Sequence, residues 1–106
     1  MVNSLELDGI YSCLADATRR DILLRLALSK TSLTVGQISR EYVPGKMSEP
    51  AISKHLRVLE KASLISRNWK GRVCEISLVS ETMLGAKEEI EGILKLLEAK
   101  LSKIER

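Results

Sequence analysis

The chain has 106 residues, of which 44% are hydrophobic and 29% are charged, which is the composition of a single folded domain and excludes a disordered or fibrous chain. One histidine and two cysteines argue against an ordinary zinc site or a disulfide framework. No apolar run approaches the roughly 20 residues of a membrane span, so we expect a cytoplasmic protein without a membrane partner.

The net charge of +3 is unevenly distributed along the chain. Residues 1–45 are balanced, whereas residues 46–72 hold seven basic side chains against two acidic ones. Residues 73–106 hold five basic and seven acidic side chains. The excess of positive charge in residues 46–72 favours a surface that binds a polyanion. A basic face that is simply exposed to solvent would have the same composition.

The first half of the chain predicts three helices. Apolar residues at helical spacing indicate a first helix over residues 1–15, and Asp16 is a candidate N-cap for the second helix. Thr34 and Gln37 have the spacing of a capping box, so a short third helix begins there and ends before Pro44-Gly45. We take residues 16–62 as the helical core.

A fourth helix is predicted over about residues 48–62. Ser48 is its candidate N-cap, and its buried stripe holds Ile52, Leu56, Leu59 and Ala62. The opposite stripe holds Lys54, Arg57 and Lys61. Residues 64–79 then change to a two-residue period around Lys70-Gly71-Arg72, which predicts a hairpin with a basic tip.

The last helix is predicted over residues 81–105, with Ser80 as its cap. Its apolar positions follow a heptad pattern, and a helix of this length extends about 35 Å, more than a four-helix core needs. We therefore expect much of it to pack on a second copy, with help from the first helix. The expected interface residues are Leu7, Tyr11, Ile90, Leu94, Leu97, Leu101 and Ile104.

Two motifs carry a resemblance to a known family. Leu-Ala-Asp-Ala-Thr-Arg-Arg-Asp-Ile-Leu at 14–23 and Ser-Glu-Pro-Ala-Ile-Ser-Lys-His-Leu-Arg-Val-Leu at 48–59, followed by Gly71-Arg72, resemble the ArsR/SmtB family of repressors. The resemblance covers about residues 10–80. It implies a mainly α winged helix-turn-helix with about five helices and a two-stranded wing, dimerising through the terminal helices.

The resemblance also implies that the helix over residues 48–62 enters the major groove of DNA. Its expected DNA-facing residues are Ser48, Glu49, Ala51, Ser53, Lys54 and Arg57, and the wing adds Lys70 and Arg72. Arg57 has the fork geometry that donates twice to a guanine edge. His55 is either a donor near DNA or a packed side chain that fixes the helix. Glu49, where relatives often have Gln, and Ser63, where they usually have Gly, depart from the family pattern.

The usual metal sites of the family lack their ligands here. The third helix has no cysteine and residues 81–106 have no histidine, so we expect no metal and no cofactor. Cys13 and Cys74 are expected to be buried inert thiols, with a redox switch as the alternative.

We therefore predict a homodimeric repressor that binds double-stranded DNA at an inverted-repeat operator. The alternative is a winged-helix module that binds a protein partner and uses its basic face weakly or not at all. An enzyme is not expected, because no nucleophile, base and orienting group can be placed together.

Overall fold

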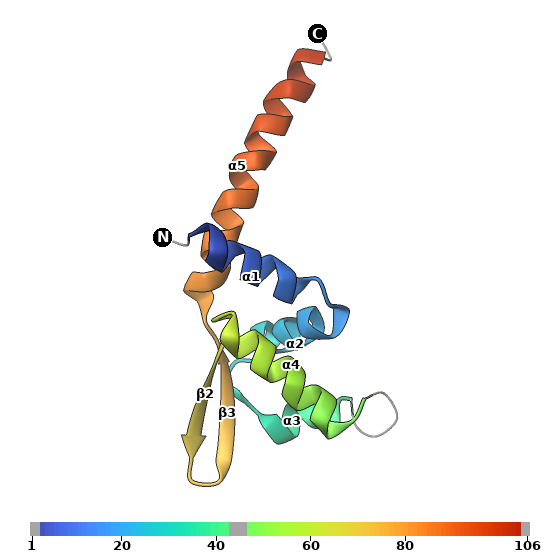
Figure 1. The fold of residues 1–106 in the computed structure, drawn as a ribbon, viewed down its shortest axis with the longest axis vertical. Helices are drawn as coiled ribbons and strands as arrows, with labels where there is room; N and C mark the ends of the chain where they lie inside the picture. Colours follow the sequence, from blue (N-terminus) through green and yellow to red (C-terminus); the bar gives the residue numbers. More distant parts are fainter. Residues whose placement is uncertain (1–2, 43–46, 105–106) are drawn as a thin grey trace.

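The computed structural model describes residues 3–42 and 47–104. Its helices are α1 (Ser4–Leu14), α2 (Ala17–Leu28), α3 (Val35–Arg40), α4 (Glu49–Lys61) and α5 (Ser80–Ile104), and its strands are β1 (Leu33–Thr34), β2 (Ile65–Lys70) and β3 (Val73–Leu78). The helices α1 to α4 form one body beside the sheet, and α5 extends from it on the side opposite the β2–β3 tip (Figure 1).

Side-chain caps define where the first four helices begin. Asn3 accepts from the amide of Glu6, and Asp16 accepts from the amide of Arg19 at 3.0 Å. The capping box that the sequence predicts at Thr34 is present with both of its hydrogen bonds. Ser48 accepts from the amide of Ala51, so the predicted starts of the second, third and fourth helices are confirmed.

The bounds of the terminal elements differ slightly from the prediction. Leu14 ends the first helix one residue early, and Ser80 is the first residue of α5 rather than a cap before it. The predicted break at Pro44-Gly45 lies outside the described residues, and α3 ends before it, at Arg40.

The sheet has three strands rather than the two that the sequence predicts. β3 pairs antiparallel with β2 on one side and with β1 on the other, in the order β1-β3-β2. Leu33 lies opposite Ile76, and Thr34 lies opposite Glu75. The strand before α3 is therefore joined to the wing by hydrogen bonds, which a two-residue segment could not reveal by alternation.

The core lies between the helices and the inner face of the sheet. Its fully buried side chains come from α1, α2, α3, α4, the segment after α4 and β3: Ile10, Cys13, Ile22, Ile38, Ile52, Leu56, Leu59, Leu64 and Ile76. Burial of one such aliphatic side chain contributes about 1.5–3 kcal/mol. Ser63 ends the α4 segment with a φ of 59°, the left-handed conformation that glycine favours. Thr82 donates to its carbonyl at 2.6 Å and so ties this turn to α5.

Candidate DNA-binding surface

Helix α4 has one apolar face and one basic face. Ile52, Leu56 and Leu59 are completely buried, as the sequence predicts, whereas Ala62, which is expected in the same stripe, follows the end of the helix and is only partly buried. Lys54, Arg57 and Lys61 are exposed on the opposite face, and no ion pair within the described part of the chain involves them. Three unpaired cations on one helix face form a surface that attracts phosphate groups.

The first turn of α4 borders a groove against α3. Glu49 and Ser53 line it on the α4 side, and Gly36 and Arg40 lie on the α3 side. Ser48 and Glu49 are exposed, whereas Ala51 and Ser53 are partly buried. The hydroxyl oxygen of Ser48 already accepts from the amide of Ala51 at 3.3 Å, so its capping bond occupies part of its hydrogen-bonding capacity.

Arg40 is a candidate that the sequence prediction missed. It is exposed in the last turn of α3, beside the groove that Glu49 and Ser53 line. Its only sequence signal is a basic residue at the end of the third helix, eight positions before Ser48.

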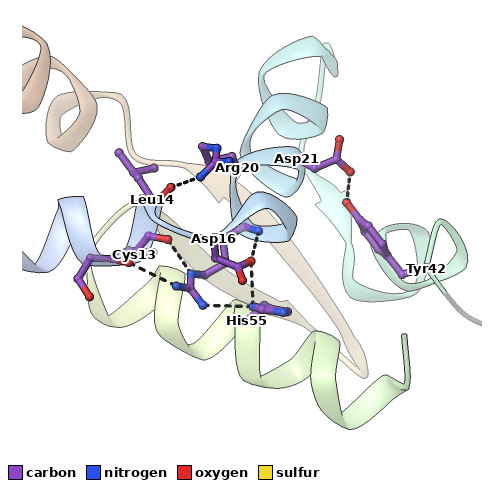
Figure 2. A network of polar contacts seen from close by, with 9 residues as sticks. Cys13, Leu14, Asp16, Arg20, Asp21, Tyr42 and His55 are labelled. Carbon is purple, nitrogen blue, oxygen red and sulfur yellow. Dashed lines mark hydrogen bonds and ion pairs between the residues drawn. The ribbon is translucent and has the colours of Figure 1, made fainter. Parts of the chain in front are cut away.

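His55 packs against the start of α2 instead of pointing freely outward. Its side chain is 16% exposed, and its Nδ1 lies 3.8 Å from Oδ2 of Asp16 and 3.4 Å from Nη1 of Arg19 (Figure 2). The Arg19 guanidinium can only donate a hydrogen bond, so its contact with His55 requires an Nδ1 without a proton. An ion pair with the Asp16 carboxylate instead requires a protonated ring. The packed alternative describes this position, and a DNA contact by His55 remains a proposal.

The Asp16 carboxylate interacts with groups on both α2 and α4. The backbone amide of Arg19, then the nearby His55 ring, lower the pKa of the Asp16 carboxyl below its ordinary value. Figure 2 shows the carboxylate between the start of α2 and the histidine of α4. The same side chain therefore caps α2 and faces α4.

The two arginines of the Ala-Thr-Arg-Arg motif bind the end of α1. Nε of Arg19 donates to the carbonyl of Cys13 at 2.7 Å, and Nη1 of Arg20 donates to the carbonyl of Leu14 at 2.6 Å (Figure 2). They satisfy carbonyls that the helix end leaves without an internal partner. The two arginines therefore join the end of α1 to the start of α2, and Arg19 also contacts His55 on α4.

The wing carries its predicted basic tip. Gly71 has a φ of 63° in the turn, and Lys70 and Arg72 are exposed on either side of it. Lys70 Nζ lies 3.2 Å from Oε2 of Glu75, whereas no ion pair within the described residues involves Arg72. At the base of the wing, Arg67 Nε lies 3.4 Å from Oε1 of Glu60, so an ion pair joins β2 to α4.

The predicted interface residues fall into two groups. Leu7 is 9% exposed, because it packs into the core of its own chain and leaves little surface for a partner. The Tyr11 hydroxyl donates to Oε1 of Glu89 at 2.7 Å, which joins α1 to α5 and raises the pKa of the tyrosine. In contrast, Ile90, Leu94, Leu97 and Leu101 on α5 are 46–57% exposed. Ile104 is the last residue of the helix.

Both cysteines are free and buried. Burial raises the pKa of the Cys13 thiol, which keeps it protonated and unreactive near neutral pH. Among the described residues, no group of three or more potential ligands could hold a metal ion. No helix in the described ranges is long and apolar enough to cross a bilayer.

A short helix α3, a basic helix α4 at an angle to it and a β2–β3 hairpin define a winged helix-turn-helix domain. Residues 14–67 match the family described as a helix-turn-helix domain. The chain therefore belongs to the helix-turn-helix family, and within it to the ArsR group of transcriptional regulators.

Curated relatives and a solved structure show how far the similarity extends. The transcriptional repressor SdpR of Bacillus subtilis is 33% identical over 72 residues, which are 68% of this chain and 74% of SdpR. The HTH-type transcriptional regulator Rv2034 of Mycobacterium tuberculosis is 43% identical over 58 residues, 55% of this chain but only half of that protein. The crystal structure of the ArsR-family regulator RHA00566 superposes with a TM-score of 0.79 at 28% identity, over 92% of this chain and 95% of the other.

Proposed function

We propose that this protein is a homodimeric transcriptional regulator that binds double-stranded DNA in a sequence-specific manner, without a metal or cofactor. The observation that carries the proposal is the face of α4 on which Lys54, Arg57 and Lys61 are exposed and form no ion pair with another described residue, opposite the completely buried Ile52, Leu56 and Leu59. Three cations on a rigid helix suit the phosphates and base edges of a major groove.

Within this proposal, contacts to base edges and contacts to phosphates have different roles. Arg57 reads a base edge, because its guanidinium donates bidentately to guanine and stands exposed in the middle of the helix. Phosphates are contacted by Lys54, Arg40, Lys70 and Arg72, which position the protein without reading sequence. Glu49 and Ser53 line the groove beside α3, and Ser48 and Ala51 lie next to them at the start of α4. All four face DNA in this arrangement, and Glu49 accepts from a cytosine amino group. His55 holds α4 on α2, with a donor role near DNA as the alternative.

The exposed stripe of α5 supports the dimer. Ile90, Leu94, Leu97 and Leu101 are each about half exposed on a helix that leaves the core, and such contiguous apolar surface is rare on a soluble monomer. A second copy packed along this stripe covers it and places two recognition helices about one DNA turn, roughly 34 Å, apart. The operator is then an imperfect inverted repeat, and the setting is the cytoplasm.

One experiment tests the proposal directly. The purified protein is used to select bound fragments from a pool of random double-stranded DNA, and binding of the enriched sequence is then measured against salt. We expect an inverted repeat and a steep loss of affinity with added salt, because phosphate contacts release counterions. Absence of enrichment, together with salt-independent capture of a protein, would favour the interaction module instead.

A further inference from the structure

The exposed indole at the tip of the wing has no role in the surface described so far. Trp69 is the only tryptophan of the chain and is 63% exposed, next to Lys70, Gly71 and Arg72. A tryptophan side chain has about 150–250 Å² of surface that is normally buried, whereas most of the Trp69 surface faces water.

The register of the hairpin explains why the indole is left outside the core. Trp69 lies opposite Cys74, and Arg67 lies opposite Ile76, so these four side chains share the inner face of the wing. Cys74 and Ile76 are buried, whereas Trp69 continues the same face past the edge of the core. The hairpin tip extends beyond α3 and α4, at the end of the molecule away from the free end of α5 (Figure 1).

The same face of the wing is directed toward the recognition helix. The ion pair between Arg67 on β2 and Glu60 on α4 joins that face to the helix. Trp69 is two residues farther along β2, on the same face and toward the tip. An exposed apolar ring beside the basic tip that Lys70 and Arg72 form is complementary to a nucleic-acid backbone, whose phosphates alternate with sugar rings.

We propose that Trp69 is a DNA-contacting residue whose indole ring packs on the deoxyribose-phosphate backbone beside the groove that the wing enters. This inference rests on the proposed function, because it adds a contact to the same DNA complex. The ring excludes water from the sugars while Arg72 and Lys70 neutralise the neighbouring phosphates. The contact is uncharged, so it adds affinity without releasing a counterion.

The sole tryptophan supplies a direct probe. Random-sequence duplexes of roughly 30 base pairs, long enough for two half-sites about one turn apart, are labelled and titrated with protein at low salt. Anisotropy of the label reports binding, and acrylamide quenching of tryptophan emission reports the exposure of Trp69 in the same samples. We expect quenching to fall at least about twofold as the anisotropy saturates, because the exposed indole becomes covered on binding.

Three variants separate ring packing from charge. Trp69→Ala should weaken duplex binding about five- to tenfold and leave the slope of affinity against salt unchanged. Trp69→Phe keeps a flat ring and should recover most of the affinity. Val73→Ala is the matched control: it removes exposed apolar surface from the other face of the same hairpin, where Val73 is 48% exposed, and should bind like the wild type.

The outcomes distinguish the two proposals. Saturating anisotropy with unchanged quenching overturns the Trp69 contact and leaves DNA binding intact. A salt slope that falls in Trp69→Ala, or Trp69→Phe binding as weakly as Trp69→Ala, also overturns ring packing. Quenching that falls with protein concentration in the absence of DNA assigns the indole to an interface between copies. No anisotropy change at any salt overturns both proposals. Thermal melting of each variant confirms that it is folded.

Discussion

Oδ2 of Asp16, the cap of α2, lies 3.8 Å from Nδ1 of His55 on α4, so one carboxylate both begins a helix and contacts the helix that we propose enters DNA. The sequence contains both residues in its two family motifs, 39 positions apart, and the fold brings them together. Two substitutions at this position can separate the roles.

Asp16→Ala is expected to lower the free energy of unfolding by about 1 kcal/mol, because the cap of α2 is lost. Asp16→Asn keeps a good cap and removes only the charge that faces His55, so its loss should be smaller. Because the folded protein lowers the pKa of Asp16 from its ordinary 3.8, the stability from its charge is present above that pH and disappears on acidification. Urea unfolding between about pH 3 and 7 should therefore be flatter for Asp16→Asn than for the wild type. Identical pH dependence would contradict this role.

Arg57→Ala should reduce affinity for the selected operator by about 1–3 kcal/mol and relax the preference at one base pair of each half-site. Lys54→Ala is the comparison on the same exposed face, and it should weaken all sequences alike while lowering the salt slope by roughly one unit. Repeating the fragment selection with each variant measures both effects. A sequence preference that survives in Arg57→Ala would remove that residue from base reading.

Glutamate at both Leu97 and Leu101 should yield a monomer, since two charges then lie on the stripe that a second copy covers. Each buried leucine contributes about 1.5–3 kcal/mol to such an interface. The matched control replaces Ala99 and Lys103 by glutamate, because those positions lie on the opposite side of α5 and have the same four-residue spacing as Leu97 and Leu101. Sedimentation equilibrium should give twice the 11.8 kDa chain mass for the wild type and the control. A wild-type mass equal to one chain would exclude the dimer.

Ser63→Gly should raise the free energy of unfolding by about 0.5–1 kcal/mol, because a side chain at a φ of 59° is strained and glycine is not. Ser66→Gly is the contrast: it places glycine inside β2, where flexibility is costly, and should lower stability. Chemical denaturation of the three proteins decides the matter. A destabilised Ser63→Gly protein would mean that the serine contributes a contact worth more than the strain.

Cys13 and Cys74 should react with a thiol reagent only slowly in the folded protein, because both are buried and the pKa of Cys13 is raised. Adding denaturant should release both thiols at once. Operator binding measured after mild oxidant should be unchanged in the wild type. An oxidant-driven loss of binding that Cys13→Ser or Cys74→Ser prevents would instead establish a redox switch.

The sequence predicts most of the fold because its strongest signals are local. The caps at Asp16, Thr34 and Ser48 each depend on an amide three residues away, and the stripe of α4 depends only on helical spacing. β1 could not be predicted, since two residues show no alternation and their partner strand lies about 40 positions away.

The candidate site also has a part that the sequence predicts and a part that it could not predict. The exposure of Lys54 and Arg57 follows from the pattern of one helix. The packed position of His55 and the groove beside Arg40 depend on how two helices meet, and helical spacing within one segment contains no such information. Leu7 belongs to the apolar residues of α1 at helical spacing, yet it is buried in its own chain because α1 packs on the core.

The central position of β3 has a mechanical consequence. Thr34, the cap of α3, pairs with Glu75, and Glu75 also holds Lys70 near the tip of the wing. A tilt of the hairpin is therefore expected to reach the first helix of the helix-turn-helix through β3. If the wing contacts DNA as we propose, a narrow or bent stretch of duplex would shift α3 with it, and the shape of the DNA beside the operator would bear on how α4 sits in its groove.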